Sequence, residues 1–264
     1  MSPIRYLCIK NHKNVGDRAS TPFHYFGRPG VDEWKDIRDP IEPPMQDVTI
    51  QTVIIGGGGL LYPGLEDSVR KYVEHPGFRT VIWGIGANHH QASRREDDPP
   101  PGWLAGAHVT GLRDLSQNKY RHVPCASCLN PDFPRLRESN PVHKFVIYEH
   151  YDRPIPVPEQ KYPVARNDLP THTEALEFLA SGRVVVTNTF HGAYWARLLG
   201  RKVLCYEPFS SRFWAPFGED PLQKITRRDL SSLEQVSLNT KTHFTYLDNC
   251  VALNRAFWGR VSRP

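Results

Sequence analysis

The sequence predicts an α/β protein with parallel β-sheets. Short apolar runs of strand length recur along the 264-residue chain, and several are continuous rather than alternating, which is typical of strands covered on both faces. Segments with helical spacing separate some of these runs, and such an alternation favours parallel pairing. The expected strands are Ile4–Ile9, Thr52–Ile55, Thr80–Trp83, His108–Gly111, Phe145–Tyr148, Val184–Thr187 and Val203–Tyr206.

Helices are expected between some of these strands and near the end of the chain. Thr171 precedes Glu174 by three residues, which is the spacing of a capping box at the start of a helix. Gly200 stands where a glycine commonly ends a helix, directly before the next strand. The expected helices are Leu65–Val73, Ser116–Tyr120, Thr171–Ala180, Gly192–Leu199 and Tyr246–Trp258.

The strands fall into two groups, which predicts two domains. The segment Asn130–Pro141 between the groups is the expected linker, because its prolines remove backbone donors and restrict the residues before them. We expect a first domain over residues 1–138 and a second over residues 139–264.

The composition is that of a globular protein and restricts its partners. Hydrophobic residues make up 39% of the chain and charged residues 23%, and no apolar run is long enough to span a membrane. The N-terminal residues lack the apolar core of a secretory signal, so we expect a cytoplasmic protein and leave peripheral association with the inner membrane face open. The net charge of +5 suits anionic small molecules or lipid-linked substrates. Without a basic tail, nucleic acid is not an expected partner.

Cysteine usage points away from a disulfide framework. The chain has five cysteines, an odd number, in a protein expected to be cytoplasmic. Cys125 and Cys128 form a C-x-x-C pair, but a zinc site needs two further ligands, for which His122 and His143 are the nearest candidates. A zinc site, a redox pair and a loop with two incidental thiols stay open; we expect the loop, and no metal.

The segment from residue 183 to residue 200 carries the clearest functional signal. The apolar run Val184–Val186 ends in the polar residues Thr187–Thr189, and His191 then opens a helical stretch. Ligands of α/β folds bind at the carboxyl ends of such strands, and the N–H groups that begin a helix favour an anion. One interpretation is a phosphate or carboxylate site with a titratable His191 beside it. The other is a histidine that caps the helix or packs in the core.

Four further strand ends carry glycine or polar residues. Several glycines directly after a strand permit a tight turn and a close approach of backbone to a ligand. The pattern is neither the dinucleotide fingerprint nor a P-loop. Together with His191, these ends predict one rim of a cleft lined from both halves of the chain. The four segments are Asn14–Asp17, Gly56–Leu61, Gly84–Asn88 and Arg113–Ser116.

This ordered set of motifs resembles the polysaccharide pyruvyl transferase family over about residues 11 to 215. The resemblance implies two Rossmann-like domains in a GT-B-like arrangement with a central cleft, and a last helix that packs back on the first domain. It also implies transfer of a pyruvyl group from phosphoenolpyruvate to a sugar of a surface polysaccharide or its lipid-linked precursor, with formation of a ketal and release of phosphate. Phosphoenolpyruvate is then a co-substrate, and no other cofactor is implied. Thr189 stands where family members often carry an arginine, and Arg212 is a candidate to replace that cation.

The chemistry of that reaction suggests roles for individual residues. A donor with a phosphate and a carboxylate needs cations, and guanidinium groups bind both in a bidentate way. Proton transfer at the enol carbon and the attacking hydroxyls needs a group such as His191, whose ordinary pKa is near neutral. The expected catalytic residues are His191, Asp17 and Arg113; the donor-binding residues are Asn188, Thr189, Gly192, Ser210, Ser211 and Arg212; the acceptor-binding residues, in the first domain apart from the last, are Asn14, Gly16, Gly57, Gly58, Gly59, Gly86, Asn88 and His150.

Structural alternatives stay open for several of these residues. Arg113 has Asp114 as a neighbour for an ion pair, and Asp17 is also suited to be a turn carboxylate. Tyr194 and Trp195 are expected in the helix core rather than as sugar platforms.

Two other functions share the same motifs. A GT-B-type glycosyltransferase with a nucleotide-sugar donor has the same cleft and glycine-rich turns, and Glu207 is then the candidate ribose contact. A non-catalytic binding or scaffold protein that kept the fold is the third interpretation.

Overall fold

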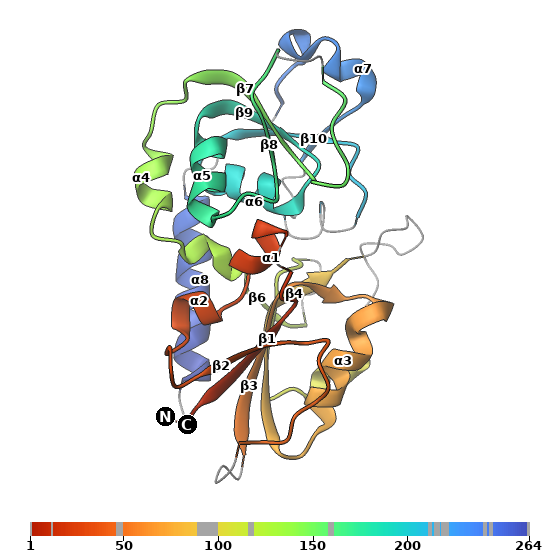
Figure 1. Ribbon diagram of the computed structural model, residues 1–264, viewed down its shortest axis with the longest axis vertical. Coiled ribbons are helices and arrows are strands. Elements are labelled where there is room, and N and C mark those ends of the chain that lie inside the picture. The colour runs from red at the N-terminus through yellow and green to blue at the C-terminus, as the bar shows by residue number, and fades with distance from the viewer. Residues whose placement is uncertain are drawn as a thin grey trace.

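The computed structural model describes residues 2–11, 13–45, 50–88, 100–115, 119–157, 161–210, 213, 217, 222–239, 242 and 245–262. Its strands form two sheets, one above the other in Figure 1, and the named strands pair in parallel. The first sheet has the order β2-β1-β3-β4-β5-β6, with β1 (Ile4–Cys8), β2 (Glu33–Asp36), β3 (Gln51–Leu61), β4 (Phe78–Ala87), β5 (Val109–Leu112) and β6 (Arg121–His122). The second has the order β11-β10-β9-β7-β8, with β7 (His143–Glu149), β8 (Val164–Arg166), β9 (Gly182–Thr187), β10 (Lys202–Tyr206) and β11 (Gln223–Ile225).

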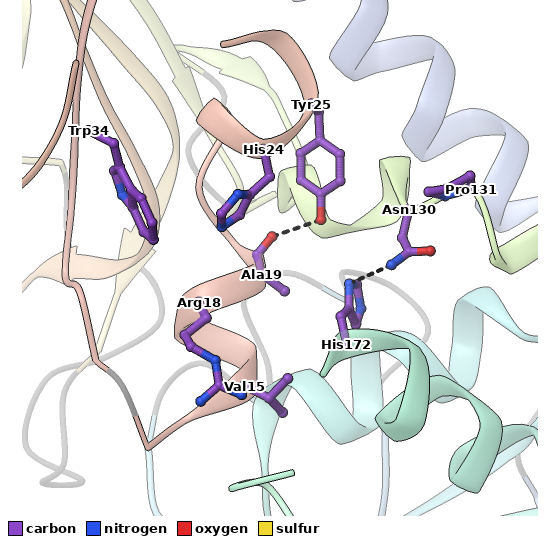
Figure 2. Close-up of a pocket in the computed structure, with 9 residues that line it drawn as sticks. All are labelled: Val15, Arg18, Ala19, His24, Tyr25, Trp34, Asn130, Pro131 and His172. Atoms are coloured by element: carbon purple, nitrogen blue, oxygen red, sulfur yellow. Dashed lines mark hydrogen bonds between the residues drawn. The ribbon is translucent and has the colours of Figure 1, made fainter. Parts of the chain in front are cut away.

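Helices lie on the faces of both sheets and between them. The two short helices after β1 approach the second half of the chain, and Figure 2 shows Val15 and Arg18 of α1 near His172 of α5. The helices are α1 (Val15–Ala19), α2 (Phe23–Phe26), α3 (Pro63–Glu74), α4 (Phe133–Arg137), α5 (His172–Ala180), α6 (Phe190–Leu198), α7 (Arg227–Leu230) and α8 (Tyr246–Val261), and the 3-10 turns are η1 (Gly102–Gly106), η2 (Ala126–Leu129) and η5 (Leu233–Gln235).

Both faces of the first sheet are buried. On β3, Val53 and Ile55 point into a cluster with Leu65 and Val69 of α3, whereas Ile54 between them points into a second cluster with Phe257 of α8. Alternate residues of one strand therefore serve two cores, which explains why the sequence shows continuous apolar runs rather than an alternation.

The second sheet is built in the same way. Val185 of β9 packs in a cluster with Leu176 of α5 and Trp195 of α6, and its neighbour Val186 packs with Leu230 of α7 on the other face. The molecule thus has two Rossmann-like α/β units with parallel sheets, as the sequence predicts. The first unit is built around the sheet of β1 to β6, and the second unit around the sheet of β7 to β11.

The last helix, α8, contacts both units. Cys250 lies in the core cluster of the second sheet, while Phe257 packs edge-on against Trp83 of β4 with ring centroids 4.9 Å apart. The fully buried Asn254 accepts a hydrogen bond from Trp83 Nε1 at 2.8 Å and donates to the carbonyl of Pro124 at 3.2 Å. These bonds satisfy a buried amide and fasten the helix to the first unit.

The structure confirms the predicted strands but moves several boundaries. The glycines of Gly56–Gly59 and Gly84–Gly86 lie inside β3 and β4, not in turns after them. The sequence missed the short strands β2, β6, β8 and β11, and it missed α4 inside the expected linker. Of the helix expected over Ser116–Tyr120, residues 116–118 lie outside the described residues, and Lys119 and Tyr120 are not helical. Within the described ranges, no helix combines the length and the apolar character needed to cross a membrane.

Candidate functional site

The carboxyl ends of β1 and β9 meet between the two units. The N–H of Val15, at the start of α1, donates to the carbonyl of Asn167 in the second unit at 2.9 Å. One residue further, Gly16 touches the ring of His191, and any side chain at Gly16 would collide with that imidazole. The predicted meeting of His191 with the Asn14–Asp17 segment is therefore present, and glycine is required there for the close approach.

His191 lies in a tight environment. Its side chain is only 4% exposed, and the ring centroid lies 5.0 Å from that of Phe190 and 5.1 Å from that of Trp195. Its Nε2 lies 3.7 Å from Sγ of Cys125. Burial raises the pKa of the Cys125 thiol, so that sulfur stays protonated at neutral pH. With Nε2 against the thiol, Nδ1 is the ring nitrogen that faces α1.

The charges of Arg113 and Asp17 both affect the pKa of the Cys125 thiol. Burial has the largest effect and raises this pKa, whereas the Arg113 guanidinium lowers it and the Asp17 carboxylate raises it. Cys125 also contacts His191, so each of the three residues expected to be catalytic interacts with this thiol, His191 by contact and the other two through their charge. They come from the ends of β5, β1 and β9.

Arg113 is almost fully buried between the two units. It is 1% exposed, and its guanidinium carbon lies 4.5 Å from the ring centroid of Phe190, the first residue of α6. Nη2 donates to the carbonyl of Ala87 at 3.0 Å, and Nε lies 3.5 Å from Oδ1 of Asp114. The ion pair that the sequence left open is thus present. Nε and Nη1 nevertheless have no hydrogen-bond partner in the described part of the chain.

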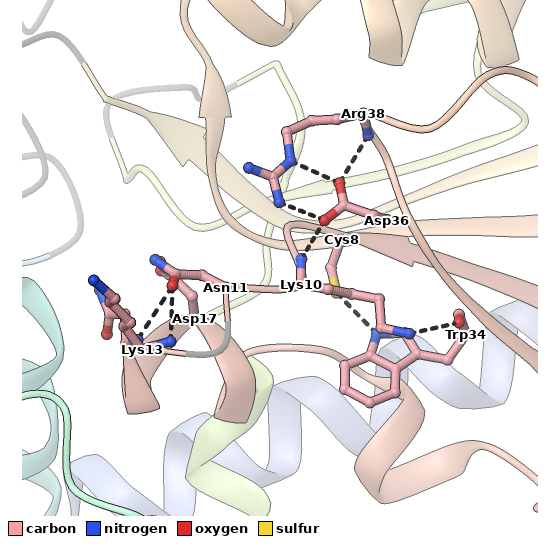
Figure 3. Close-up of polar contacts among 9 residues, drawn as sticks. Cys8, Lys10, Asn11, Lys13, Asp17, Trp34, Asp36 and Arg38 are labelled. Atoms are coloured by element: carbon pink, nitrogen blue, oxygen red, sulfur yellow. Dashed lines mark hydrogen bonds and ion pairs between the residues drawn. The ribbon is translucent and has the colours of Figure 1, made fainter.

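Asp17 lies in the first turn of α1 and is partly buried. Its Oδ2 accepts a hydrogen bond from Nδ2 of Asn11 at 3.3 Å. Asn11 in turn accepts from the backbone N–H of Lys13 at 3.0 Å, and Figure 3 shows the three residues side by side. The ring of Tyr151, which follows β7 in the other unit, lies 6.0 Å from Nζ of Lys13. Asn11, Lys13 and Tyr151 were not among the residues predicted from the sequence, although each follows a predicted strand end.

The hydroxyl of Thr189 caps α6. Its Oγ1 accepts from the N–H of Gly192 at 3.0 Å and lies 3.1 Å from Oγ1 of Thr187. The helix begins at Phe190, two residues earlier than expected, and the Gly192 N–H is already bonded. Gly192 is instead a packing position, because a side chain there would press on Thr187 and on the ring of Tyr148. The Thr189 hydroxyl is thus the acceptor of the Gly192 N–H in this structure, and that Gly192 binds the donor substrate stays a prediction.

Asn188 holds the loop after β7. Its Oδ1 accepts from the N–H of His150 at 2.8 Å, and its Nδ2 donates to the carbonyl of Arg153 at 2.7 Å. The ring of His150 stacks on Tyr151 with centroids 4.6 Å apart, and both residues follow β7 in the second unit. Ser210 is buried after β10; Ser211 and Arg212 lie outside the described residues, as do Ser116, His89 and His90.

The remaining predicted glycines of β3 and β4 lie where the backbone packs closely, against the end of α1 and against the ion pair of Arg113 with Asp114. The N–H of Gly57 donates to the carbonyl of Ser20 at 3.3 Å, and a side chain at Gly57 would lie 2.7 Å from that oxygen. Gly86 leaves room for Arg113 and Asp114 in the same way. Gly58 has a φ of 95°, Gly59 is buried within β3, Asn88 is 6% exposed beyond β4, and Asn14 is the N-cap of α1.

The C-x-x-C segment packs on α6. The carbonyl of Cys125 accepts from the Tyr194 hydroxyl at 3.0 Å, and Ser127 Oγ accepts from Trp195 Nε1 at 2.9 Å. Tyr194 and Trp195 are 1% and 0% exposed, which confirms that they are core residues. Among the described side chains, no group of three or more His, Cys, Asp or Glu is placed to hold a metal ion.

Comparisons with known proteins give a structural likeness alone. No family model and no curated protein matches the chain. A crystal structure of an uncharacterised protein from Klebsiella pneumoniae subsp. pneumoniae NTUH-K2044 is similar, with 18% sequence identity and a TM-score of 0.46. The match covers 78% of this chain and 83% of that one.

Proposed function

We propose that the chain is a transferase that moves a pyruvyl group from phosphoenolpyruvate onto a sugar of a surface polysaccharide or its lipid-linked precursor. The observation that carries the proposal is Arg113, a buried guanidinium whose Nε and Nη1 have no hydrogen-bond partner among the described residues, next to the first turn of α6 and near His191. Leaving buried donors without partners costs free energy, which an anion with several oxygens recovers. The ordered motifs of the sequence support the same reaction.

The reaction balances with the groups available. One sugar hydroxyl adds to the central carbon of the enol, whose methylene takes up a proton to become a methyl group. The second hydroxyl then displaces the phosphate from the same carbon, which closes the ketal. Arg113 binds the carboxylate or phosphate of the donor. His191 carries the proton, and Asp17, in the first turn of α1, accepts or orients the hydroxyl.

The test is acceptor-dependent release of inorganic phosphate from phosphoenolpyruvate. The purified protein is incubated with phosphoenolpyruvate and a panel of diol-bearing glycosides and lipid-linked sugars, and products are examined by mass spectrometry. We expect phosphate release only with an acceptor, and a product heavier than that acceptor by one pyruvyl ketal. No release across the panel, together with tight binding of a nucleotide-sugar, would overturn the proposal.

A nucleotide-sugar glycosyltransferase is the second candidate, and Glu207 favours it. Glu207 directly follows β10 with a φ of 37°, a conformation that non-glycine residues rarely adopt and that clusters at functional sites. Its side chain is exposed. Thermal shifts with nucleotide-sugars and with phosphoenolpyruvate separate the two reactions. Stabilisation by a nucleotide-sugar that Glu207→Gln abolishes supports the glycosyltransferase.

A further inference from the structure

A cavity lies between the start of β5 and the last turns of α8. Its volume is about 760 Å³, within the range of small-molecule sites. Figure 1 shows α8 running from the second unit to the first, and the cavity lies beside the C-terminal end of this helix. The lining residues that the structure describes are His108 and Val109 on the strand side, and Ala256, Gly259 and Arg260 on the helix side.

The cavity and the candidate site lie at opposite ends of β5. His108 directly precedes this strand, whereas Arg113 directly follows it. The extended chain between these two residues spans about 16 Å, because each residue of a strand adds about 3.3 Å. A molecule in the cavity therefore occupies a place distinct from the one beside Arg113 and His191.

Two of the lining side chains have donors that no described residue uses. Nδ1 of His108 accepts a hydrogen bond from the backbone N–H of Thr80 at 3.2 Å, so the proton of the neutral imidazole is on Nε2 and that nitrogen is left to donate to a ligand. Arg260 is exposed and forms no ion pair with a described residue. Because both groups donate and neither accepts, they suit a ligand rich in acceptor oxygens.

A second arginine, Arg79 of β4, lies at the same end of α8. Its Nη1 donates to the carbonyl of Val261, the last residue of the helix, at 3.2 Å. The C-terminal end of a helix carries a partial negative charge that repels anions, and this guanidinium offsets it. No carboxylate is among the cavity's described lining residues. The two arginines therefore give this end of α8 an excess of positive charge.

The rest of the lining is small and apolar. Val109 and Ala256 contribute short side chains, and Gly259 contributes none. A side chain at Gly259 would meet no described atom within 4 Å beyond the helix's own backbone, so packing does not require a glycine there, although glycine is unfavourable inside a helix. Its missing side chain leaves the cavity open next to Arg260.

We propose that this cavity binds a phosphate monoester through Arg260, His108 and Arg79. A phosphate monoester offers three strong acceptor oxygens to these donors, and its charge of nearly −2 is balanced by the two guanidinium groups. The apolar lining takes the organic group that the phosphate carries. The ester is either a soluble molecule or the headgroup of a phospholipid such as phosphatidic acid, since both present the same phosphate. This binding is independent of the transfer reaction proposed above.

The experiment is isothermal titration of the full chain with glycerol 3-phosphate, and glycerol is the uncharged comparator. Arg260→Gln removes a charge from the cavity, whereas the matched control Arg255→Gln removes an exposed arginine of the same helix that does not line it. We expect Arg260→Gln to weaken the affinity about tenfold and Arg255→Gln to leave it unchanged. Gly259→Leu has room for its side chain, fills the cavity and abolishes binding without lowering the melting temperature.

Two further arms identify the site and the source of the phosphate. Binding that persists in Arg113→Lys belongs to the cavity and not to the candidate site. In sedimentation with phosphatidylcholine vesicles, binding that needs phosphatidic acid and is lost in Gly259→Leu indicates a lipid headgroup, whereas titration by glycerol 3-phosphate without vesicle binding indicates a soluble ester. No binding in either assay, equal losses in Arg260→Gln and Arg255→Gln, or a loss in Arg113→Lys that Arg260→Gln does not share would overturn the proposal.

Discussion

The β9–α6 junction and the end of β5 both carry buried polar residues, but they differ in how completely those residues are hydrogen-bonded. At the junction, Thr187, Thr189 and the Gly192 N–H bond to one another. At the end of β5, Arg113 is equally buried, yet two of its donors have no partner within the described residues. Both regions meet at Phe190, whose ring lies under the guanidinium.

This difference distinguishes a region that holds side chains in place from a group that is able to bind a ligand. A capped helix start with bonded hydroxyls is rigid and offers a ligand little, whereas unbonded donors in a dry environment interact strongly with an anion. Under the proposed function, the junction holds His191 in place and Arg113 supplies the affinity for the anion. The segment with the clearest motif in the sequence would then differ from the segment that binds the ligand most strongly.

The largest effect is expected from Arg113→Lys. Lysine keeps the charge but cannot offer the guanidinium fork, so we expect kcat/KM for phosphoenolpyruvate to fall about 100-fold or more with the fold intact. Steady-state kinetics and the melting temperature measure the two effects. Asp114→Asn is the matched control for the ion pair, because it removes that charge and leaves the guanidinium. Loss of stability without loss of kcat/KM in Arg113→Lys means that Arg113 is only structural.

The next effect is expected from His191→Ala. Removal of a group that transfers protons lowers kcat by about 10²- to 10⁴-fold, with little change in KM. Gly16→Ala is a second route to the same loss, because its methyl group displaces the imidazole without removing it. Rates at several pH values show whether a titrating group is lost. Unchanged activity in His191→Ala means that His191 does not carry the proton, and activity in neither protein favours the scaffold interpretation.

A smaller effect, on stability rather than on activity, is expected from Thr189→Val. Valine has the shape of threonine but no hydroxyl, so the Gly192 N–H loses its acceptor and the free energy of unfolding falls by about 1 kcal/mol. Denaturant unfolding measures it, and Thr189→Ser, which keeps the hydroxyl, is the control. A many-fold rise in the KM for phosphoenolpyruvate at unchanged stability shows instead that Thr189 contacts the donor.

The fold was predictable from the sequence where apolar runs are long. The runs in β3, β4, β7 and β9 serve cores on both faces, and that requirement is visible in composition alone. The short strands β2 and β8 were missed because they are partly exposed edge strands with charged residues such as Glu33 and Arg166. Their pairing depends on neighbours distant in the sequence.

The candidate site was predictable as a set of strand ends but not as a hydrogen-bond network. Because parallel strands end at one edge, Asn14–Asp17, Arg113 and His191 were expected to gather. No pattern shows that Thr189 is already bonded, that Gly86 makes room for Arg113, or that Cys125 contacts His191. These facts depend on side-chain packing between segments far apart in the chain.

The smallest effect is expected from Cys125→Ser, which probes the contact between the thiol and His191. Burial raises the pKa of the thiol, and its Sγ lies 3.7 Å from Nε2 of His191, so we expect its role to be to hold the ring. Serine preserves a hydrogen-bonding atom there, so we expect kcat to stay within about threefold of wild type. Cys125→Ala removes it, and kcat falls further as the ring loses one restraint. Equal, complete loss of kcat in both variants means that the thiol itself reacts. Cys125 is then a second reactive group beside His191.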